Sequence, residues 1–98
     1  MSRTAKFRLR LYVAGDAHNS TQALANLNAL CRAHLPKCHH IEVVNVFREP
    51  DRALADGIFM TPTLVKLVPA PVQRIVGTLS QTQPLLSVLG LEPEAIAA

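Results

Sequence analysis

The chain has 98 residues, of which 49% are hydrophobic and 17% charged, and its formal net charge is +3. This length fits one domain, and the balance of apolar and charged residues is typical of a chain that folds. The longest stretch without a charge, 75–91, is shorter than the roughly 20 residues that span a bilayer. We therefore expect a single domain over 1–98 that crosses no membrane, with flexible termini at 1–5 and 92–98.

Cysteine usage indicates where the protein works. The chain has 2 cysteines and, near its N-terminus, no apolar segment of the signal-peptide kind. This is typical of a reducing cytoplasm and not of a disulfide-stabilised secreted domain. Because most simple enzymes are larger, the size favours a cytoplasmic binding protein without catalytic activity.

The N-terminal residues are strongly basic, with Arg3, Lys6, Arg8 and Arg10 ahead of the first acidic residue, Asp16. Such a face could neutralise the phosphates of a nucleic acid, or it could be the solvated face of one strand. The chain has only 4 aromatic residues, too few for a base-stacking platform among the basic side chains. We therefore favour the solvated strand face and expect no nucleic-acid partner.

The first half of the chain predicts a strand, a helix and a second strand. Apolar residues alternate with Lys, Arg and Tyr12 over 6–13, which is the period of a strand. A helix then begins near Asn19 or Ser20, either of which can act as its N-cap, and ends before Pro36. The run at 40–47 (HIEVVNVF) predicts a strand covered on both faces, parallel to the first.

The second half predicts a short helix, a hairpin and a last helix. The short helix over 52–56 is opened by Pro50 and closed by Gly57. Two apolar runs, 63–68 and 72–76, predict two antiparallel strands, and the last helix carries Pro84 in its first turn.

The element order β-α-β-α-β-β-α is that of the thioredoxin fold, an α/β class. Pro62 precedes the third strand, where thioredoxins have a cis-proline. An X-Pro bond is the one place where a cis peptide bond is cheap, but a trans proline at the start of a strand is the alternative.

Neither redox catalysis nor a metal centre is expected. The loop 15–20, which would hold the reactive thiol of a thioredoxin, has no cysteine, and both cysteines follow at the far end of the helix. One cluster has metal-like spacing, although a buried cysteine beside loop histidines explains it as well. Its members are Cys31, His34, Cys38, His39 and His40. We also interpret three acids around the short helix, Glu49, Asp51 and Asp56, as solvated residues at helix ends.

Three segments together resemble the KaiB family of circadian clock proteins. They are 9–27 (LRLYVAGDAHNSTQALANL), 43–50 (VVNVFREP) and 60–80 (MTPTLVKLVPAPVQRIVGTLS). The third is the most specific, with its Thr-Pro-Thr-Leu, Pro-x-Pro-Val and Ile-x-Gly-x-Leu elements. The resemblance extends over 6–91.

This resemblance implies a non-enzymatic regulator without a cofactor, acting in circadian timing or a related stress-adaptation system. KaiB-family proteins bind the ATPase KaiC, recruit KaiA in cyanobacteria, and compete with the sensor kinase SasA. They switch between a resting form, usually a homotetramer with the order βαββααβ, and a thioredoxin-like monomer that binds KaiC. A stand-alone thioredoxin-like sensory or chaperone-like module is the alternative, and a redox enzyme is the weakest one.

The resemblance also assigns roles to particular residues. Lys66 and Arg74 match basic residues of the family and are the candidates for partner contacts, the alternative being solvated side chains on an exposed strand face. Pro62, Pro69 and Pro71 match the family prolines and are expected to set the conformation.

Two departures from the family pattern limit what carries over. Glu42 stands where cyanobacterial members usually place a lysine, which puts capture of KaiA in doubt. The acidic tail of those members is also missing, so the sequence looks like a divergent or non-cyanobacterial KaiB-like protein.

Overall fold

The computed structural model describes residues 7–34 and 39–89, which form one sheet with helices on both faces. The elements, in chain order, are β1 (Phe7–Val13), α1 (His18–His34), β2 (His39–Asn45), α2 (Pro50–Ala55), β3 (Thr63–Val68), β4 (Gln73–Val76) and α3 (Thr82–Leu89). The predicted order βαβαββα is therefore confirmed. The expected flexible termini, 1–5 and 92–98, lie outside the described residues.

The sheet has the strand order β2-β1-β3-β4, so β1 is central. It pairs in parallel with β2 and antiparallel with β3, and β4 completes an antiparallel hairpin with β3, as predicted. The hairpin turn is proline-rich, and the peptide bonds that precede Pro62, Pro69 and Pro71 are all cis. Of the two alternatives for the peptide bond before Pro62, cis and trans, the structure has cis.

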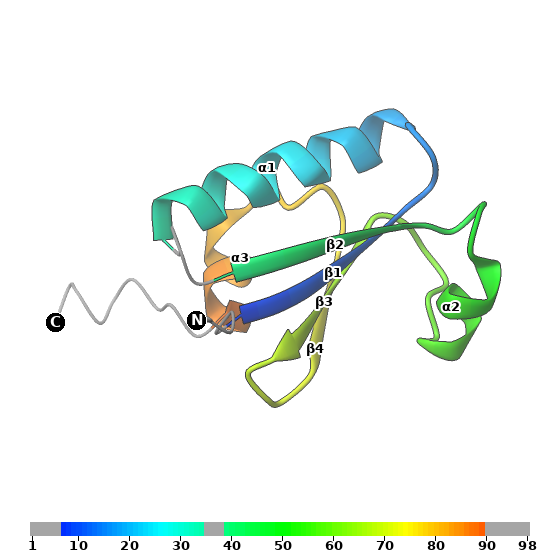
Figure 1. Cartoon of the computed structure of the whole chain (residues 1–98). Helices are drawn as coiled ribbons and strands as arrows, with labels where there is room; N and C mark the ends of the chain where they lie inside the picture. The colour runs from blue at the N-terminus through cyan, green and yellow to red at the C-terminus, as the bar shows by residue number, and fades with distance from the viewer. Residues whose placement is uncertain (1–6, 35–38, 90–98) are drawn as a thin grey trace, which may run out of the picture.

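The larger part of the core lies between the sheet and α1 together with α3 (Figure 1). Alternate residues of β1 point to this side, and α1 contributes one residue from each successive turn, which is the spacing of the buried face of a helix. The buried members are Leu9, Leu11, Val13, Ala23, Leu27, Cys31, Leu64, Leu79, Leu85 and Leu89.

The opposite face of the sheet is covered only at one end, where α2 packs beside the last residues of β1 (Figure 1). A smaller cluster lies there, formed by Tyr12, Val44, Ala53 and Val65. Tyr12 belongs to the alternating face of the first strand that was predicted to be solvated, yet its side chain is fully buried. The prediction fails because a helix 40 residues along the chain folds back over this position.

Two further predictions differ from the structure in detail. The strand β2 is not covered on both faces, because it lies at an edge of the sheet and Val43 is half-exposed. The helix α1 begins at His18, so Ser20 lies within its first turn. The Ser20 hydroxyl accepts a hydrogen bond from the backbone N–H of Ala14 (3.1 Å) and so ties the helix start to the end of β1.

No helix in the described ranges is long and apolar enough to cross a membrane.

Candidate functional site

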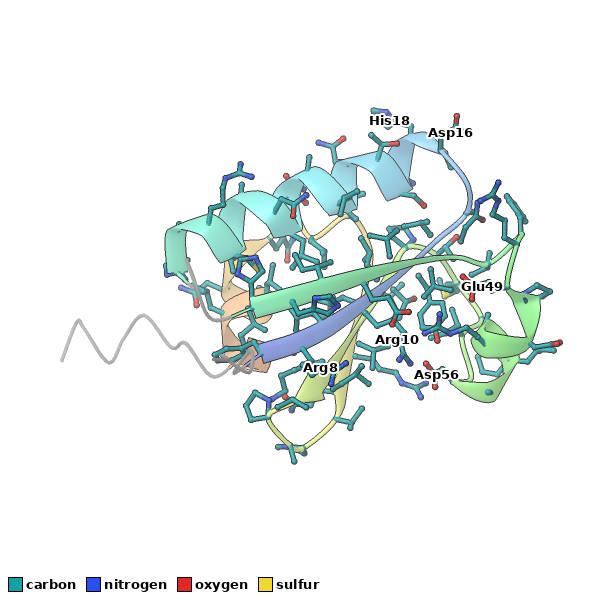
Figure 2. All side chains as sticks on the ribbon, in the orientation of Figure 1. Arg8, Arg10, Asp16, His18, Glu49 and Asp56 are labelled. Atoms are coloured by element: carbon teal, nitrogen blue, oxygen red, sulfur yellow. The ribbon has the colours of Figure 1, made fainter. Side chains whose placement is uncertain are left out.

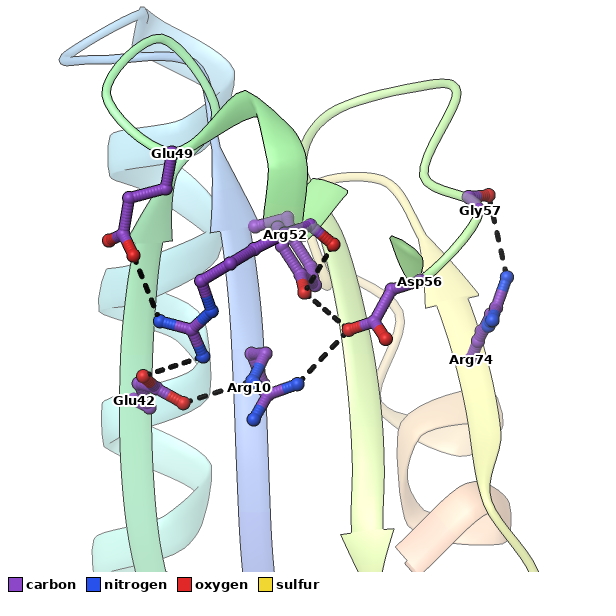
Figure 3. A network of polar contacts seen from close by, with 8 residues as sticks. Arg10, Glu42, Glu49, Arg52, Asp56, Gly57 and Arg74 are labelled. Carbon is purple, nitrogen blue, oxygen red and sulfur yellow. Dashed lines mark hydrogen bonds and ion pairs between the residues drawn. The ribbon is translucent and has the colours of Figure 1, made fainter. Parts of the chain in front are cut away.

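A group of six polar side chains, here called the polar network, joins β1, β2 and α2 on the face opposite α1 (Figure 3). The network extends from the central strand β1 to both ends of α2, at Glu49 and at Asp56. Its members are Arg10, Tyr12, Glu42, Glu49, Arg52 and Asp56.

Arg10 is the centre of the polar network. Its Nε donates to Glu42 Oε1 at 2.9 Å, and its Nη1 donates to Asp56 Oδ2 at 3.0 Å. Burial alone would lower the pKa of Arg10, but the hydrogen bonds to Glu42 and Asp56 outweigh it and raise the pKa. The guanidinium therefore holds its charge and binds two acids that are distant in sequence.

Tyr12, two residues after Arg10 on β1, binds the same carboxylate, that of Asp56. Its hydroxyl donates to Asp56 Oδ2 and lies 3.3 Å from the carbonyl oxygen of Arg52. The hydrogen bond from Tyr12, with that from Arg10, lowers the pKa of Asp56, whereas burial raises the pKa of Tyr12. Asp56 thus accepts from two donors that both belong to β1.

The outer part of the polar network connects α2 to the edge strand. Arg52 lies 2.8 Å from Glu42 Oε2 and 3.1 Å from Glu49 Oε1. The hydrogen bond from Arg10 lowers the pKa of Glu42. Glu49 and Asp51 are exposed at the start of α2, as predicted, although Glu49 is ion-paired with Arg52. The interpretation of Asp56 as a solvated helix-end acid is wrong, since it is partly buried and ion-paired with Arg10.

An apolar surface adjoins the C-terminal end of α2. The carbonyl oxygen of Gly57 accepts a long hydrogen bond (3.5 Å) from Arg74 Nη1 (Figure 3). Phe59 and Met60 follow Gly57 and are 90% and 61% exposed. A shallow pocket of about 250 Å³ lies among these groups, and we call the residues that line it the Arg74 surface. They are Gly57, Ile58, Phe59, Met60, Thr63, Arg74 and Val76.

The apolar character extends beyond the Arg74 surface. A second pocket, of about 270 Å³, shares Phe59 and Met60 with the first and reaches Phe47, which is 74% exposed. Exposed aromatic and methionine side chains beside an arginine are the composition of protein interfaces.

The two basic residues predicted to contact a partner lie on opposite faces of the sheet. Arg74 is exposed and pairs with Val65, whose side chain belongs to the α2 side. Lys66 pairs with Leu9 on the side of α1 and α3 and is only 4% exposed. The alternative of a solvated Lys66 on an exposed strand face is therefore wrong for this fold, because the sheet register turns its side chain inward. Its role in a partner contact stays a prediction.

The basic N-terminal residues also separate. Arg8 is exposed near the start of β1, away from Asp56, whereas Arg10 is ion-paired (Figure 2). The solvated-face interpretation thus fits Arg8 but not Arg10. Arg3 and Lys6 lie outside the described residues.

Cys31, the cysteine that lies within the described residues, is chemically unreactive in the folded chain. Cys31 is fully buried, and burial raises the pKa of its thiol to about 11, so little reactive thiolate forms near neutral pH. Asp16 lies in the turn before α1 and His18 begins this helix, where a thioredoxin has its active cysteine (Figure 2). Among residues 7–34 and 39–89, no three His, Cys, Asp or Glu side chains come together to hold a metal ion. Cys38 lies outside that part of the chain.

The polar network was not predicted from the sequence. Of the residues that form the Arg74 surface, the sequence predicted a role only for Arg74. A weak signal was present, because Arg10 and Glu42 occupy equivalent places in two strands that were predicted to be parallel neighbours. Nothing local to Asp56 indicated that it would meet β1.

Comparison with known sequences gives one consistent result. The sequence profile of the KaiB domain matches residues 10–91. Circadian clock protein KaiB3 of a Synechocystis species is 40% identical over 88 residues, covering 90% of this chain and 86% of that protein. Circadian clock oscillator protein KaiB of Thermosynechococcus vestitus is 41% identical over 88 residues, covering 90% of this chain and 82% of that protein.

Solved structures support the fold class. The N-terminal domain of Synechococcus elongatus SasA superimposes with a TM-score of 0.75 at 21% identity, covering 99% of this chain and 89% of that domain. Chloroplastic thioredoxin z superimposes with a TM-score of 0.72 at 14% identity, covering 93% of this chain and 96% of that protein. At these identities the likeness establishes a thioredoxin-like fold and nothing more.

Proposed function

The chain belongs to the KaiB family of circadian clock proteins, and from this premise we propose that it is a non-enzymatic regulator of a KaiC-type ATPase. Binding would change the ATPase or phosphorylation cycle of that partner in circadian timing or a related stress response. The family supports the clock role, and the inert Cys31 and the cysteine-free loop before α1 support a role without catalysis.

The observation that carries the proposal is the Arg74 surface. It combines a nearly fully exposed aromatic ring, Phe59, with Met60 and Val76 around a shallow pocket. Exposing such side chains to water costs free energy that a partner recovers by covering them, and buried aromatic and arginine side chains are the usual anchors of an interface. We place the ATPase contact here.

The positive charge of Arg74 indicates which chemical group the partner must present to it. Arg74 is exposed, and its one hydrogen bond within residues 7–34 and 39–89 is the long contact to the carbonyl oxygen of Gly57, so its guanidinium is available for a bidentate bond. A KaiC-type partner is therefore expected to present a carboxylate beside an apolar side chain that enters the pocket.

Other parts of the resemblance stay proposals of lower weight. A homotetramer with dimer or monomer forms, the alternative order βαββααβ, and contacts through Lys66 all follow from the family alone. A SasA-type kinase would be a competitor for the same ATPase. KaiA is a doubtful partner, because Glu42 is held in two ion pairs instead of supplying a positive charge.

The test is an affinity measurement between the full chain and the KaiC-type ATPase of the same organism, in each nucleotide state. The substitution R74E should weaken binding by at least about tenfold, because it places like charges together, and F59A should weaken it similarly. R8E is the matched control, since Arg8 is another exposed arginine at a strand position but lies away from α2.

Equal affinities of wild type, R74E and F59A would move the contact elsewhere on the molecule. No binding in any nucleotide state would reject the ATPase and leave the stand-alone binding module.

A further inference from the structure

The helix α2 is short and depends on neighbouring elements for its position. Six residues make fewer than two turns, which is well below the length at which a helix is stable by itself. At its start, the side chain of Glu49 makes no capping hydrogen bond. Its place on the sheet must therefore come from packing of Ala53 and from the polar network.

The C-terminal end of α2 has well-defined geometry. The backbone N–H of Gly57 donates to the carbonyl of Leu54 (3.0 Å), and that of Ile58 donates to Ala53 (2.9 Å). This pair of bonds, with Gly57 at φ +67°, is a Schellman motif, in which the two bonds set the direction of the chain as it leaves the helix. The exposed Phe59 and Met60 follow directly.

Asp56 immediately precedes this turn and ties it to the central strand. Its carboxylate accepts from Arg10 Nη1 (3.0 Å) and from the Tyr12 hydroxyl, both on β1. On its other side, the next residue, Gly57, accepts the hydrogen bond from Arg74. Asp56 itself is not one of the residues that line the pocket.

Phe59 cannot fix its own position, because 90% of its surface is in water. Its location relative to Arg74 depends on where the backbone from Asp56 to Ile58 is held. We infer that Asp56 is the positioning residue of the Arg74 surface, acting through its bonds to Arg10 and Tyr12 and not by touching the partner. This inference rests on the proposed function for the identity of that partner, the KaiC-type ATPase.

Glu42 provides a matched control. It is also an acid that accepts from Arg10, at 2.9 Å, and it is similarly exposed, but it belongs to β2 and contacts α2 only through the side chain of Arg52 (2.8 Å), one turn before Asp56 and Gly57. Removing either carboxylate costs Arg10 one partner, and removing Glu42 also costs Arg52 one, so each change breaks two contacts. Only removal of Asp56 breaks contacts at the residue that directly precedes Gly57 and the segment that carries Phe59.

The experiment compares D56A with E42A by amide hydrogen exchange in NMR and by affinity for the KaiC-type ATPase. For D56A we expect exchange at Gly57 and Ile58 to rise by about tenfold relative to amides of β1, since local opening no longer breaks the bonds to Arg10 and Tyr12. Binding should weaken by about tenfold as well, because ordering the loop then opposes binding. For E42A both quantities should change by less than about threefold.

D56N keeps an acceptor for Tyr12, so its exchange rate and its affinity should fall between those of wild type and D56A. If D56A does not fold, D56N against E42Q makes the same comparison.

Three results would overturn the inference: unchanged exchange at Gly57 and Ile58 in D56A, selective exchange without any loss of affinity, or equal effects of D56A and E42A. If the wild type binds no KaiC-type ATPase while D56A still opens the turn selectively, the proposed function fails and the positioning of the segment stands.

Discussion

Arg10 is the residue that makes the polar network possible, because its planar guanidinium bonds two carboxylates from different elements at once. Glu42 is 32 residues away and Asp56 is 46 residues away along the chain. A lysine would present a single ammonium in place of this fork. The side chain is 23% exposed, so the ion pairs are partly shielded from water and are worth more than typical surface pairs.

Tyr12 offers a direct measure of the network's strength. The substitution Y12F removes only the hydroxyl that donates to Asp56 and leaves the buried ring in place. We expect the free energy of unfolding to fall by about 1.5–3 kcal/mol, the usual net value of a hydrogen bond to a charged group. Urea denaturation of both proteins measures it, and an unchanged midpoint would show that the hydroxyl adds nothing.

The lowered pKa of Asp56 predicts a pH dependence with a definite sign. An acid whose pKa is lower in the folded chain stabilises the fold above its unfolded pKa, about 4, and loses this contribution as pH falls through the folded value. The difference in unfolding free energy between wild type and D56N should be constant from pH 7 to about pH 5 and then shrink toward pH 2. A difference that stays constant down to pH 2 contradicts the ion pair.

Cys31 should be chemically silent in the folded protein. Its burial and its pKa of about 11 predict that a thiol reagent modifies it only after unfolding. The measurement uses C38S, so that Cys31 is the one thiol left, with and without denaturant. Fast modification of Cys31 in the native protein near neutral pH would contradict this prediction and would support a redox role.

At the scale of elements, α2 differs from the other helices because its connections, more than its own length, hold it in place. The Gly57 turn is one such connection, and φ +67° there is a conformation that a side chain rarely adopts. A Cβ at Gly57 would also lie 3.4 Å from Arg74 Nη1.

We therefore expect G57A to destabilise the fold by about 1–2 kcal/mol, which is the cost of the left-handed conformation for an ordinary residue. G57N serves as the control, because asparagine tolerates this conformation better and should cost less. Thermal unfolding of the two variants makes the comparison. Equal melting temperatures for G57A and wild type would mean that the turn changes its conformation without cost.

The strands and helices themselves were predictable because their signals are local. The alternation over β1, the helical period of α1 and the Pro50 and Gly57 boundaries of α2 each involve neighbouring residues. The inward side chain of Lys66 and the exposed edge of β2 were not predictable, since they depend on sheet register and strand order, which no local pattern records.

The whole molecule has one well-covered face and one that is covered only at its end. The helices α1 and α3 bury the larger cluster, while α2 leaves exposed apolar residues around the Arg74 surface. The family resemblance located Arg74 but not the apolar residues beside it, because Phe59 and Met60 join it only when α2 and β4 come together in the fold.

The most direct test of the central claim is an NMR map of the full chain with and without the KaiC-type ATPase. We expect the amide signals of 57–63 and 74–76 to broaden or shift most, with little change along α1. Changes confined to α1 and α3, with the Arg74 surface unaffected, would contradict it.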